Sequence, residues 1–151
     1  MESAINTIVS FVGVNRFLSN FYASPIIYND LLFPTVEHAY QAAKAKDSYG
    51  VQYDIAYFVP TSKEAKTRGR SVNMRTDWED IKLVVMRELI VKKFEIPALR
   101  HALIDTGDAT LIEGNTWNDT FWGVCNNIGE NHLGKILMEV RMQIFKDLDI
   151  L

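Results

Sequence analysis

The chain has 151 residues, 48% of them hydrophobic and 23% charged, with a formal net charge of −3 at pH 7. This length fits one domain, residues 1–151, and the hydrophobic share excludes a wholly disordered chain. The mildly acidic charge excludes a protein that coats nucleic acid non-specifically, although a local basic patch is compatible with it. No apolar run approaches the ~20 residues of a membrane-spanning helix, and no signal peptide is recognisable. The single cysteine cannot form an internal disulfide, so we expect a cytoplasmic, soluble protein.

Hydrophobic periodicity and capping residues predict the elements in chain order. Asn29 and Asp30 separate two short apolar runs, which is typical of a tight hairpin turn. Thr61 opens a capping box, and Asp77 and Asn131 are expected N-caps. The glycine- and asparagine-rich segment 114–130 is predicted to be a loop. The expected elements are a strand over 7–12, a hairpin over 25–34, helices over 35–46, 61–69, 77–94 and 97–105, a strand over 110–113, and a helix over 131–146.

The apolar residues of these helices recur at helical spacing and define their expected inward faces. The first helix has an apolar stripe of three residues, and each of the two long helices has an apolar stripe of five residues. We therefore predict a compact single domain that is mainly α-helical with a few short β-strands, an α+β fold. The expected inward residues are Val36, Ala39 and Ala43, then Ile81, Val84, Val85, Leu89 and Ile90, and finally Leu133, Ile136, Leu137, Val140 and Ile144.

One face of the helix 35–46 carries a carboxylate, a phenol, an amide and an ammonium. Glu37, Tyr40, Gln41 and Lys44 follow each other at helical spacing, opposite the small apolar stripe. The face is either a solvated surface or a set of groups that converge on a ligand. A tyrosine is a poor choice for a merely solvated position, which favours the second interpretation.

Two further segments have the composition of a ligand pocket. Arg70 and Arg75 flank a turn after Gly69, and guanidinium groups match phosphate oxygens, although ordinary surface charge would give the same pattern. The loop 115–123 places two tryptophans and a phenylalanine around Asp119. Aromatic rings in a loop either pack back onto the core or form a stacking wall for a planar ligand.

Several other kinds of site are excluded by spacing. The histidines, His38, His101 and His132, have no partner spacing for zinc, so no metal site is expected. Cys125 has no histidine signature and is interpreted as a passive thiol. The glycines form neither a phosphate-binding loop nor a dinucleotide fingerprint.

These same segments resemble the NADAR family, also called YbiA-like. The matching stretches follow the family's order and cover nearly the whole chain, which makes the resemblance specific. The resemblance implies a mostly helical domain that handles ribosyl nucleotides and cleaves N-glycosidic bonds. The stretches are FLSNFY (17–22), FPTVEHAYQAAKA (33–45), GRSVNMRTDWEDIKLVVM (69–86), NDTFWG (118–123) and GENHLGKILMEVR (129–141).

The resemblance also implies roles for individual residues. Glu37 matches the family's essential glutamate and Asp119 the aspartate before the aromatic-Trp-Gly triplet, so the two carboxylates are the expected catalytic pair. Lys44 is a third catalytic candidate, because the resemblance also allows a mechanism that passes through a Schiff base at a lysine. The expected substrate-binding residues are Asn20, Phe21, Tyr40, Gly69, Arg70, Arg75, Trp78, Trp122, Gly123 and Asn131.

Within the family, three functions are compatible with these residues. The first is removal of ADP-ribose from guanine bases of DNA, which would reverse modification by DarT-like toxins and counter an anti-phage defence. The second is the same bond cleavage on ribosylated riboflavin-pathway intermediates, which are small ribosyl nucleotides. The third is a non-catalytic ADP-ribose reader. None of them requires a cofactor, a membrane or an obligate protein partner.

Overall fold

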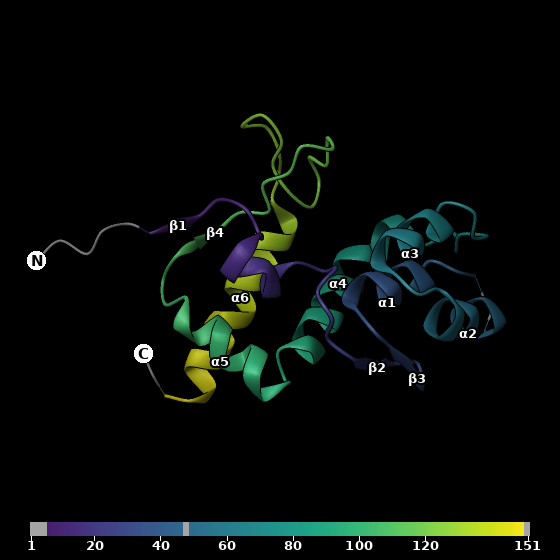
Figure 1. Cartoon of the computed structure of the whole chain (residues 1–151), viewed down its shortest axis with the longest axis horizontal. Coiled ribbons are helices and arrows are strands. Elements are labelled where there is room, and N and C mark those ends of the chain that lie inside the picture. The colour runs from purple at the N-terminus through teal and green to yellow at the C-terminus, as the bar shows by residue number, and fades with distance from the viewer. Residues whose placement is uncertain (1–5, 47–48, 150–151) are drawn as a thin grey trace, which may run out of the picture. The chain divides into compact units, whose positions relative to one another are not determined.

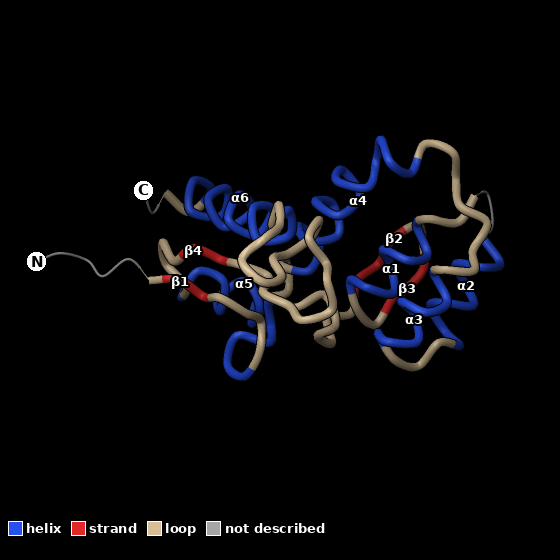
Figure 2. Tube along the Cα trace, turned by 90° about the horizontal axis from the view of Figure 1, so that it is seen from above, coloured by secondary structure: helices blue, strands red, loops and turns tan. Residues whose placement is uncertain are grey.

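The structure is a computed structural model that describes residues 6–46 and 49–149. The described residues form two compact units, which we treat separately. The central unit comes from residues 20–96, and the terminal unit comes from residues up to 19 together with those from 97 onward. Helices dominate both units, and the strands are short (Figures 1 and 2). The prediction of a mainly helical fold with a few short strands is confirmed.

The central unit contains one hairpin and four helices. Strands β2 and β3 pair antiparallel, with Ile26 opposite Phe33, and their turn at Asn29 and Asp30 has positive φ angles of 53° and 63°, as the hairpin prediction requires. Within this unit, α1 contacts α2, α3, α4 and both strands of the hairpin. The elements are β2 (Ile26–Tyr28), β3 (Leu31–Phe33), α1 (Val36–Ala43), α2 (Tyr49–Phe58), α3 (Ser62–Gly69) and α4 (Trp78–Lys93).

Helix α1 is the innermost element of the central unit, because all of its residues are buried. It begins at a cap in which the Thr35 hydroxyl accepts a hydrogen bond from the His38 amide at 3.1 Å. The His38 ring extends the cap, with Nδ1 2.7 Å from the Thr35 hydroxyl and Nε2 2.8 Å from the Val59 carbonyl. Burial lowers the pKa of His38, which keeps the ring neutral and gives it a structural role.

Two predictions about the central unit are corrected. Helix α2 was not expected, because its exposed tyrosines hide the usual contrast between an apolar and a charged face. Val84 of α4 was expected to face inward, but it is 68% exposed. Trp78 and Met86 are buried on α4 instead, so the buried face of this helix is rotated away from Val84.

The terminal unit combines a parallel strand pair with two α-helices and one 3-10 helix. Strand β1 pairs with β4 through Thr7 and Thr110, and α6 packs against β4. The expected strand over 7–12 ends at Ile8, and Val12 is 67% exposed. The expected inward stripe of the last helix is confirmed. The elements are β1 (Thr7–Ile8), η1 (Gly13–Leu18), α5 (Pro97–Asp105), β4 (Thr110–Leu111) and α6 (His132–Asp147).

The N-cap prediction for α6 is correct in position but not in mechanism. Asn131 precedes the helix in a left-handed conformation, with φ 53°, and makes no side-chain cap. Arg141, within the helix, donates to the Thr106 hydroxyl at 2.8 Å and to the Ala109 carbonyl at 2.7 Å. These bonds tie α6 to the connection between α5 and β4. No helix among the described residues is long and apolar enough to cross a membrane.

A buried lysine makes the stability of the central unit depend on pH. Lys93 is 0% exposed, and its ammonium lies 5.9 Å and 5.3 Å from the ring centroids of Tyr22 and Phe94. Burial lowers its pKa to about 7 from an ordinary value of 10.5. Between these two pH values the unfolded chain binds more protons than the folded chain, so the free energy of unfolding rises with pH in this window.

We therefore expect Lys93→Met to raise the free energy of unfolding at pH 7 and to flatten its increase toward pH 10. Denaturant unfolding at several pH values measures both effects. Lys92→Met, at the preceding and only partly buried position, is the matched control and should keep the pH dependence of the native protein. The same slope in the Lys93 variant and in the native protein would contradict the prediction.

Candidate functional site

The central unit holds a buried carboxylate. Glu37 lies in the first turn of α1 and is only 7% exposed, and its Oε1 accepts a 2.7 Å hydrogen bond from Nε2 of Gln41. Its backbone amide donates to the carbonyl of Asn20 at 3.1 Å. The interpretation of this helix face as a solvated surface is wrong, because Tyr40 and Gln41 are buried as well.

Gly69 makes room for the side chain that holds Glu37. Gln41 is 4% exposed, and a Cβ at Gly69 would overlap its Oε1. Any side chain at Gly69 would therefore push the Gln41 amide away from its place beside Glu37. Gly69 was expected among the substrate-binding residues, and the structure shows it packed against Gln41, the hydrogen-bond partner of Glu37.

Aromatic rings and a lysine continue the face of α1. The ring centroids of Tyr40 and Trp78 are 5.1 Å apart, and Nζ of Lys44 lies 5.4 Å from the Tyr40 centroid. Trp78 is 2% exposed, which favours packing in the core over an open stacking surface. Burial lowers the pKa of Lys44, and the nearby negative charge of Glu37 partly opposes this effect. A lysine with a lowered pKa is a better nucleophile near neutral pH.

The arginine-containing turn is attached to the end of α1 by its backbone. The amide of Arg75 donates to the Lys44 carbonyl at 2.8 Å. The Arg75 side chain binds Asp77 through Nε–Oδ1 at 2.6 Å and Nη2–Oδ2 at 3.0 Å, which lowers the pKa of Asp77. Asp77 therefore pairs with Arg75 and makes no side-chain cap on α4, contrary to the capping prediction. Arg70 is exposed at the end of α3.

The two other predicted residues of the central unit differ in exposure. Asn20 is 9% exposed, and its Nδ2 lies 3.6 Å from the sulfur of Met86. Its Oδ1 is buried and has no hydrogen-bond partner among the described residues. Phe21 is 40% exposed, and its carbonyl accepts a hydrogen bond from the Ser62 hydroxyl at 3.1 Å.

Asp119 organises the loop that follows β4 in the terminal unit. Its Oδ1 accepts hydrogen bonds from the amides of Phe121 at 3.2 Å and Trp122 at 2.9 Å. Asn115 clamps the backbone of Asp119, accepting from its amide at 3.0 Å and donating to its carbonyl at 2.8 Å. One oxygen of the predicted catalytic carboxylate is thus held by the turn that it stabilises.

A second loop carboxylate was missed by the sequence analysis. A Cβ at Gly123 would overlap both the carbonyl and Oε2 of Glu113. Asn131 joins the same group, because its Oδ1 accepts from the Glu113 amide at 3.0 Å and its Nδ2 donates to the Leu111 carbonyl at 2.9 Å. Glu113 lies two residues after the end of the two-residue strand β4, and no spacing pattern in the sequence distinguishes it.

The loop aromatics and asparagines show how this segment is ordered. The Trp122 ring meets the Phe121 ring edge-on at 4.8 Å between centroids and lies 6.5 Å from the His132 ring. This arrangement favours packing for Trp122, whereas Trp117 is 59% exposed. Several asparagines adopt left-handed conformations with positive φ angles, namely Asn118, Asn126, Asn127 and Asn131.

The predicted residues are thus distributed over both units. The central unit brings Glu37, Tyr40, Lys44, Gly69 and Trp78 together around α1. Asn20, Phe21, Arg70 and Arg75 also belong to the central unit. The terminal unit holds four predicted residues, and the pairing of the two predicted catalytic carboxylates stays a prediction. The residues of the terminal unit are Asp119, Trp122, Gly123 and Asn131.

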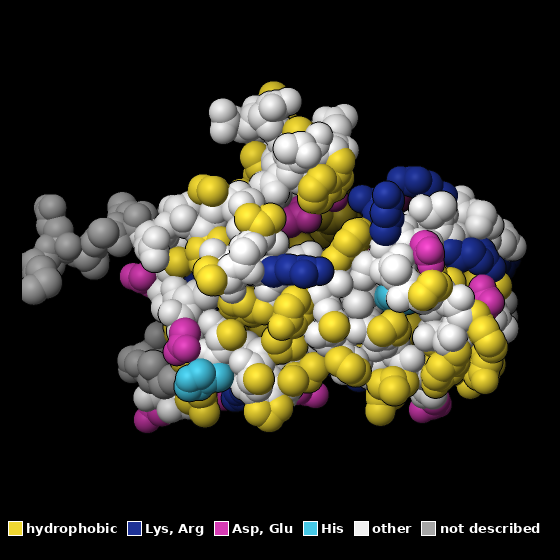
Figure 3. All heavy atoms as spheres, viewed as in Figure 1, with side chains coloured by type: hydrophobic (Ala, Val, Ile, Leu, Met, Phe, Trp, Pro, Cys, Tyr) yellow, Lys and Arg dark blue, Asp and Glu magenta, His cyan; other side chains and the backbone are white. Residues whose placement is uncertain are grey.

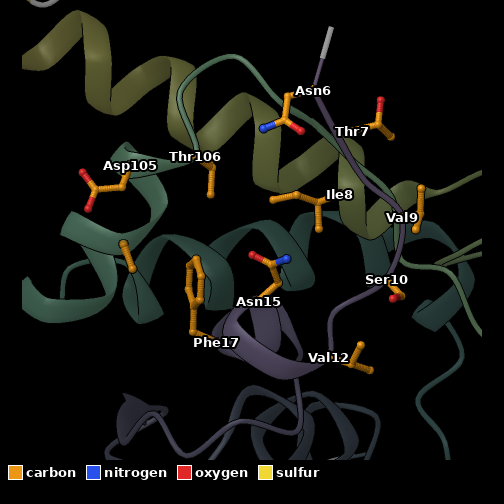
Figure 4. A pocket seen from close by; sticks show the side chains of 11 residues that line it. Asn6, Thr7, Ile8, Val9, Ser10, Val12, Asn15, Phe17, Asp105 and Thr106 are labelled. Carbon is orange, nitrogen blue, oxygen red and sulfur yellow. The ribbon is translucent and has the colours of Figure 1, made fainter. Parts of the chain in front are cut away.

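The terminal unit also has a pocket of about 600 Å³ that contains none of the predicted residues. Figure 4 shows Ile8, Asn15 and Thr106 pointing toward one another in this pocket. The described residues contain no cluster of three or more histidine, cysteine, aspartate or glutamate side chains suited to hold a metal ion. The lining of the pocket includes a carboxylate, Asp105, whose Oδ2 lies 3.6 Å from Nε2 of His101.

The packing of Gln41 against Gly69 gives a test of how Glu37 is positioned. We expect Gly69→Ala to lower the free energy of unfolding by about 1–3 kcal/mol, since the added methyl group overpacks a buried contact. Gly50→Ala is the control, because no atom lies within 4 Å of a Cβ there and alanine favours the α2 helix. Denaturant unfolding measures both variants. A Gly69 variant as stable as the Gly50 variant would contradict the proposed packing.

Comparison with known proteins extends the resemblance to named relatives. The chain is 41% identical over 131 residues to an N-glycosidase of Nostoc punctiforme, which covers 83% of each chain. It is 37% identical over 144 residues to N-glycosidase YbiA of Escherichia coli (strain K12), covering 92% of this chain and 89% of that one. It is also 36% identical over 131 residues to a riboflavin biosynthesis protein of Vibrio vulnificus, covering 85% of this chain but 35% of that protein.

Structure and family model agree with these matches. The NMR structure of E. coli YbiA, 35% identical in sequence, matches with a TM-score of 0.82 and covers 96% of this chain and 89% of that chain. The N-glycosidase relatives support an N-glycosyl hydrolase activity for the chain. The model of the NADAR domain matches residues 10–145. The chain therefore belongs to the NADAR family.

Proposed function

We propose that this protein hydrolyses the N-glycosidic bond between ADP-ribose and guanine in DNA. The observation that carries the proposal is the Glu37 carboxylate, which is 7% exposed and oriented by Gln41 in the helix that matches the family motif. A carboxylate held out of bulk water stabilises positive charge far better than a solvated one. The proposed activity would reverse modification by DarT-like toxins and protect a genome from them.

The reaction places clear demands on such a carboxylate. As the bond between the anomeric carbon and guanine breaks, the ribose gains oxocarbenium character, and a water molecule adds to that carbon. The departing guanine takes up one proton and the attacking water loses one, so the products are ADP-ribose and unmodified DNA. We assign Glu37 to stabilising the ribose cation or accepting the water proton, and Asp119 to the partner role.

Lys44 supports a second route for the same bond cleavage. Its amine has a lowered pKa and shares the α1 face with Glu37. In this route the ribose ring opens, the amine adds to the anomeric carbon with loss of guanine, and water then hydrolyses the resulting Schiff base. Borohydride reduction during turnover would leave a covalent ribosyl adduct on Lys44 only if this route operates.

Two other functions make different predictions. The riboflavin biosynthesis protein among the relatives favours a small ribosyl nucleotide as the substrate. A non-catalytic ADP-ribose reader would bind its ligand without turnover and would not need the buried Glu37. Both alternatives can be tested with the purified protein.

The substrate test uses an ADP-ribosylated oligonucleotide and, separately, ribosylated riboflavin-pathway intermediates. We expect release of ADP-ribose from the oligonucleotide, detected by mass spectrometry, because the proposed site accepts a ribosylated base. If the modified DNA stays intact and the small ribotide is hydrolysed, the substrate is a riboflavin-pathway intermediate and not ADP-ribosylated DNA. Tight binding of ADP-ribose in calorimetry, with neither substrate cleaved, would identify a reader.

The variant Glu37→Gln tests the catalytic role of the carboxylate while keeping its shape. We expect turnover to fall by roughly 100–10,000-fold, the range typical of general acid–base assistance. Binding of ADP-ribose should persist, because the arginines and aromatic rings are unchanged. The loss of the first-turn charge alone should cost only a few tenths to about 1 kcal/mol of stability.

Glu64→Gln is the matched control, since Glu64 is the first-turn acid of α3 and is exposed. It removes the same charge from a helix start without touching α1, and it should keep the turnover of the native protein. Native turnover in the Glu37 variant, on whichever substrate the protein cleaves, would remove Glu37 from the mechanism.

A further inference from the structure

Helix α2 carries a row of exposed aromatic rings along one side. Tyr49, Tyr53 and Tyr57 follow each other four residues apart, and Phe58 closes the row. Their side chains are between 44% and 70% exposed. Ring centroids are 6.4 Å apart for Tyr49–Tyr53, 4.7 Å for Tyr53–Tyr57 and 6.1 Å for Tyr53–Phe58. We call these four residues the aromatic row.

The row is held in place by contacts beneath it. Ile55 and Ala56 of α2 are buried, and the Tyr57 hydroxyl accepts a hydrogen bond from the Leu32 amide of β3 at 3.3 Å. Hydrophobic side chains gather on the face of the central unit where α2 and the hairpin lie (Figure 3). The rings are therefore presented outward from a packed helix and are not needed to fill the core.

A polar hollow lies at the N-terminal end of the aromatic row, beside Tyr49. It measures about 550 Å³, and its lining includes Tyr49, Lys46 and Arg75. Its wall is fixed by a hydrogen bond of 2.6 Å from Asn29 to Gln52 of α2. Asp77 also lines the hollow and pairs with Arg75, so Lys46 is the cation that is left for a ligand phosphate. The hollow thus joins a ring of the aromatic row to a cationic side chain, a combination that binds a phosphate next to a stacked base.

Positive charge continues beside the row on α3. Arg68 binds Asp54 of α2, with Nε 3.6 Å from Oδ2, which brings the two helices together. The segment 62–70 carries four cationic residues and one acidic residue, although the whole chain has a net charge of −3. The cations are Lys63, Lys66, Arg68 and Arg70. The central unit therefore contains the local basic patch that an acidic chain can still form.

We infer that the aromatic row and the hollow form a binding track for single-stranded nucleic acid. Bases would stack on Tyr49 and Tyr53, while Lys46 and the α3 cations would neutralise the phosphates. Stacking requires no particular base, so the track would hold DNA of any sequence. The inference deepens the proposed function, and rests on it, because it supplies a place for the strand that flanks the modified guanine.

Charge distinguishes this occupant from a second copy of the chain. Aromatic rings with a polar rim are also found at interfaces between protein copies, so charge is the feature that separates the two occupants. Lys46 borders the aromatic row at one end, and the basic α3 lies along its side. A polyanion with planar groups matches these features better than a net acidic copy of the same chain does.

The test measures fluorescence anisotropy of a labelled, unmodified oligothymidylate with the full chain at low salt. We expect the native protein to bind the single strand more tightly than a duplex. The double variant Tyr49→Ala/Tyr53→Ala should weaken binding about fivefold or more, since each base–aromatic stack has at least that effect. Tyr53→Phe keeps the ring and should bind like the native protein.

A second pair of variants tests the charge. Lys46→Ala should reduce both the affinity and the slope of its logarithm against the logarithm of salt concentration. Lys135→Ala, at an exposed position of α6, is the control and should change neither. Absence of binding by the native protein, or unchanged binding by the double tyrosine variant, would overturn the inference. The inference would also be overturned if sedimentation showed a concentration-dependent dimer of the native protein and the double tyrosine variant abolished this dimer.

The outcome is separable from that of the proposed function. An ADP-ribosylated guanosine monomer has no flanking strand, so the double tyrosine variant should cleave it at the native rate if the proposed function holds. Strand binding without cleavage of any modified substrate would contradict the proposed function and leave the track intact. Cleavage of modified DNA with no contribution from Tyr49 and Tyr53 would contradict the binding track and support the proposed function.

Discussion

The burial of α1 on every side is the constraint on which the central unit depends. A helix with one wet face can leave its polar side chains in water, but α1 has no such face, so its polar groups need partners inside the protein. Glu37 therefore depends on Gln41, and Gln41 in turn depends on the missing side chain of Gly69. Two segments far apart in the sequence, α1 and the end of α3, thus determine the position of one carboxylate.

This dependence explains which features were predictable. The cap of α3, the hairpin turn and the inward stripe of α6 follow from short-range chemistry, and the structure confirms them. The local pattern left open whether the polar face of α1 is solvated, because the cover comes from α2, α3 and α4. Helix α2 was missed for the related reason that its exposed face is aromatic.

The candidate site was predictable mainly through the resemblance. The face of α1 was visible from spacing alone, but its two interpretations stayed open until burial distinguished them. Glu113 was not visible, since its place beside Gly123 arises from a loop that folds back on itself. Side-chain hydrogen bonds also show that matching a family motif does not separate chemical from structural roles. Asp119 and Asn131, both predicted site residues, stabilise the loop through hydrogen bonds of their side chains.

The left-handed asparagines of that loop have a thermodynamic consequence. Glycine would adopt these conformations with less strain, but it would also leave the unfolded chain with more conformations to lose. Asn118, Asn126, Asn127 and Asn131 thus restrict the segment before any ligand arrives. Ordering a mobile loop consumes part of the free energy of binding. A loop that is already ordered leaves more of that energy for affinity and behaves as a fixed wall, not as a closing lid.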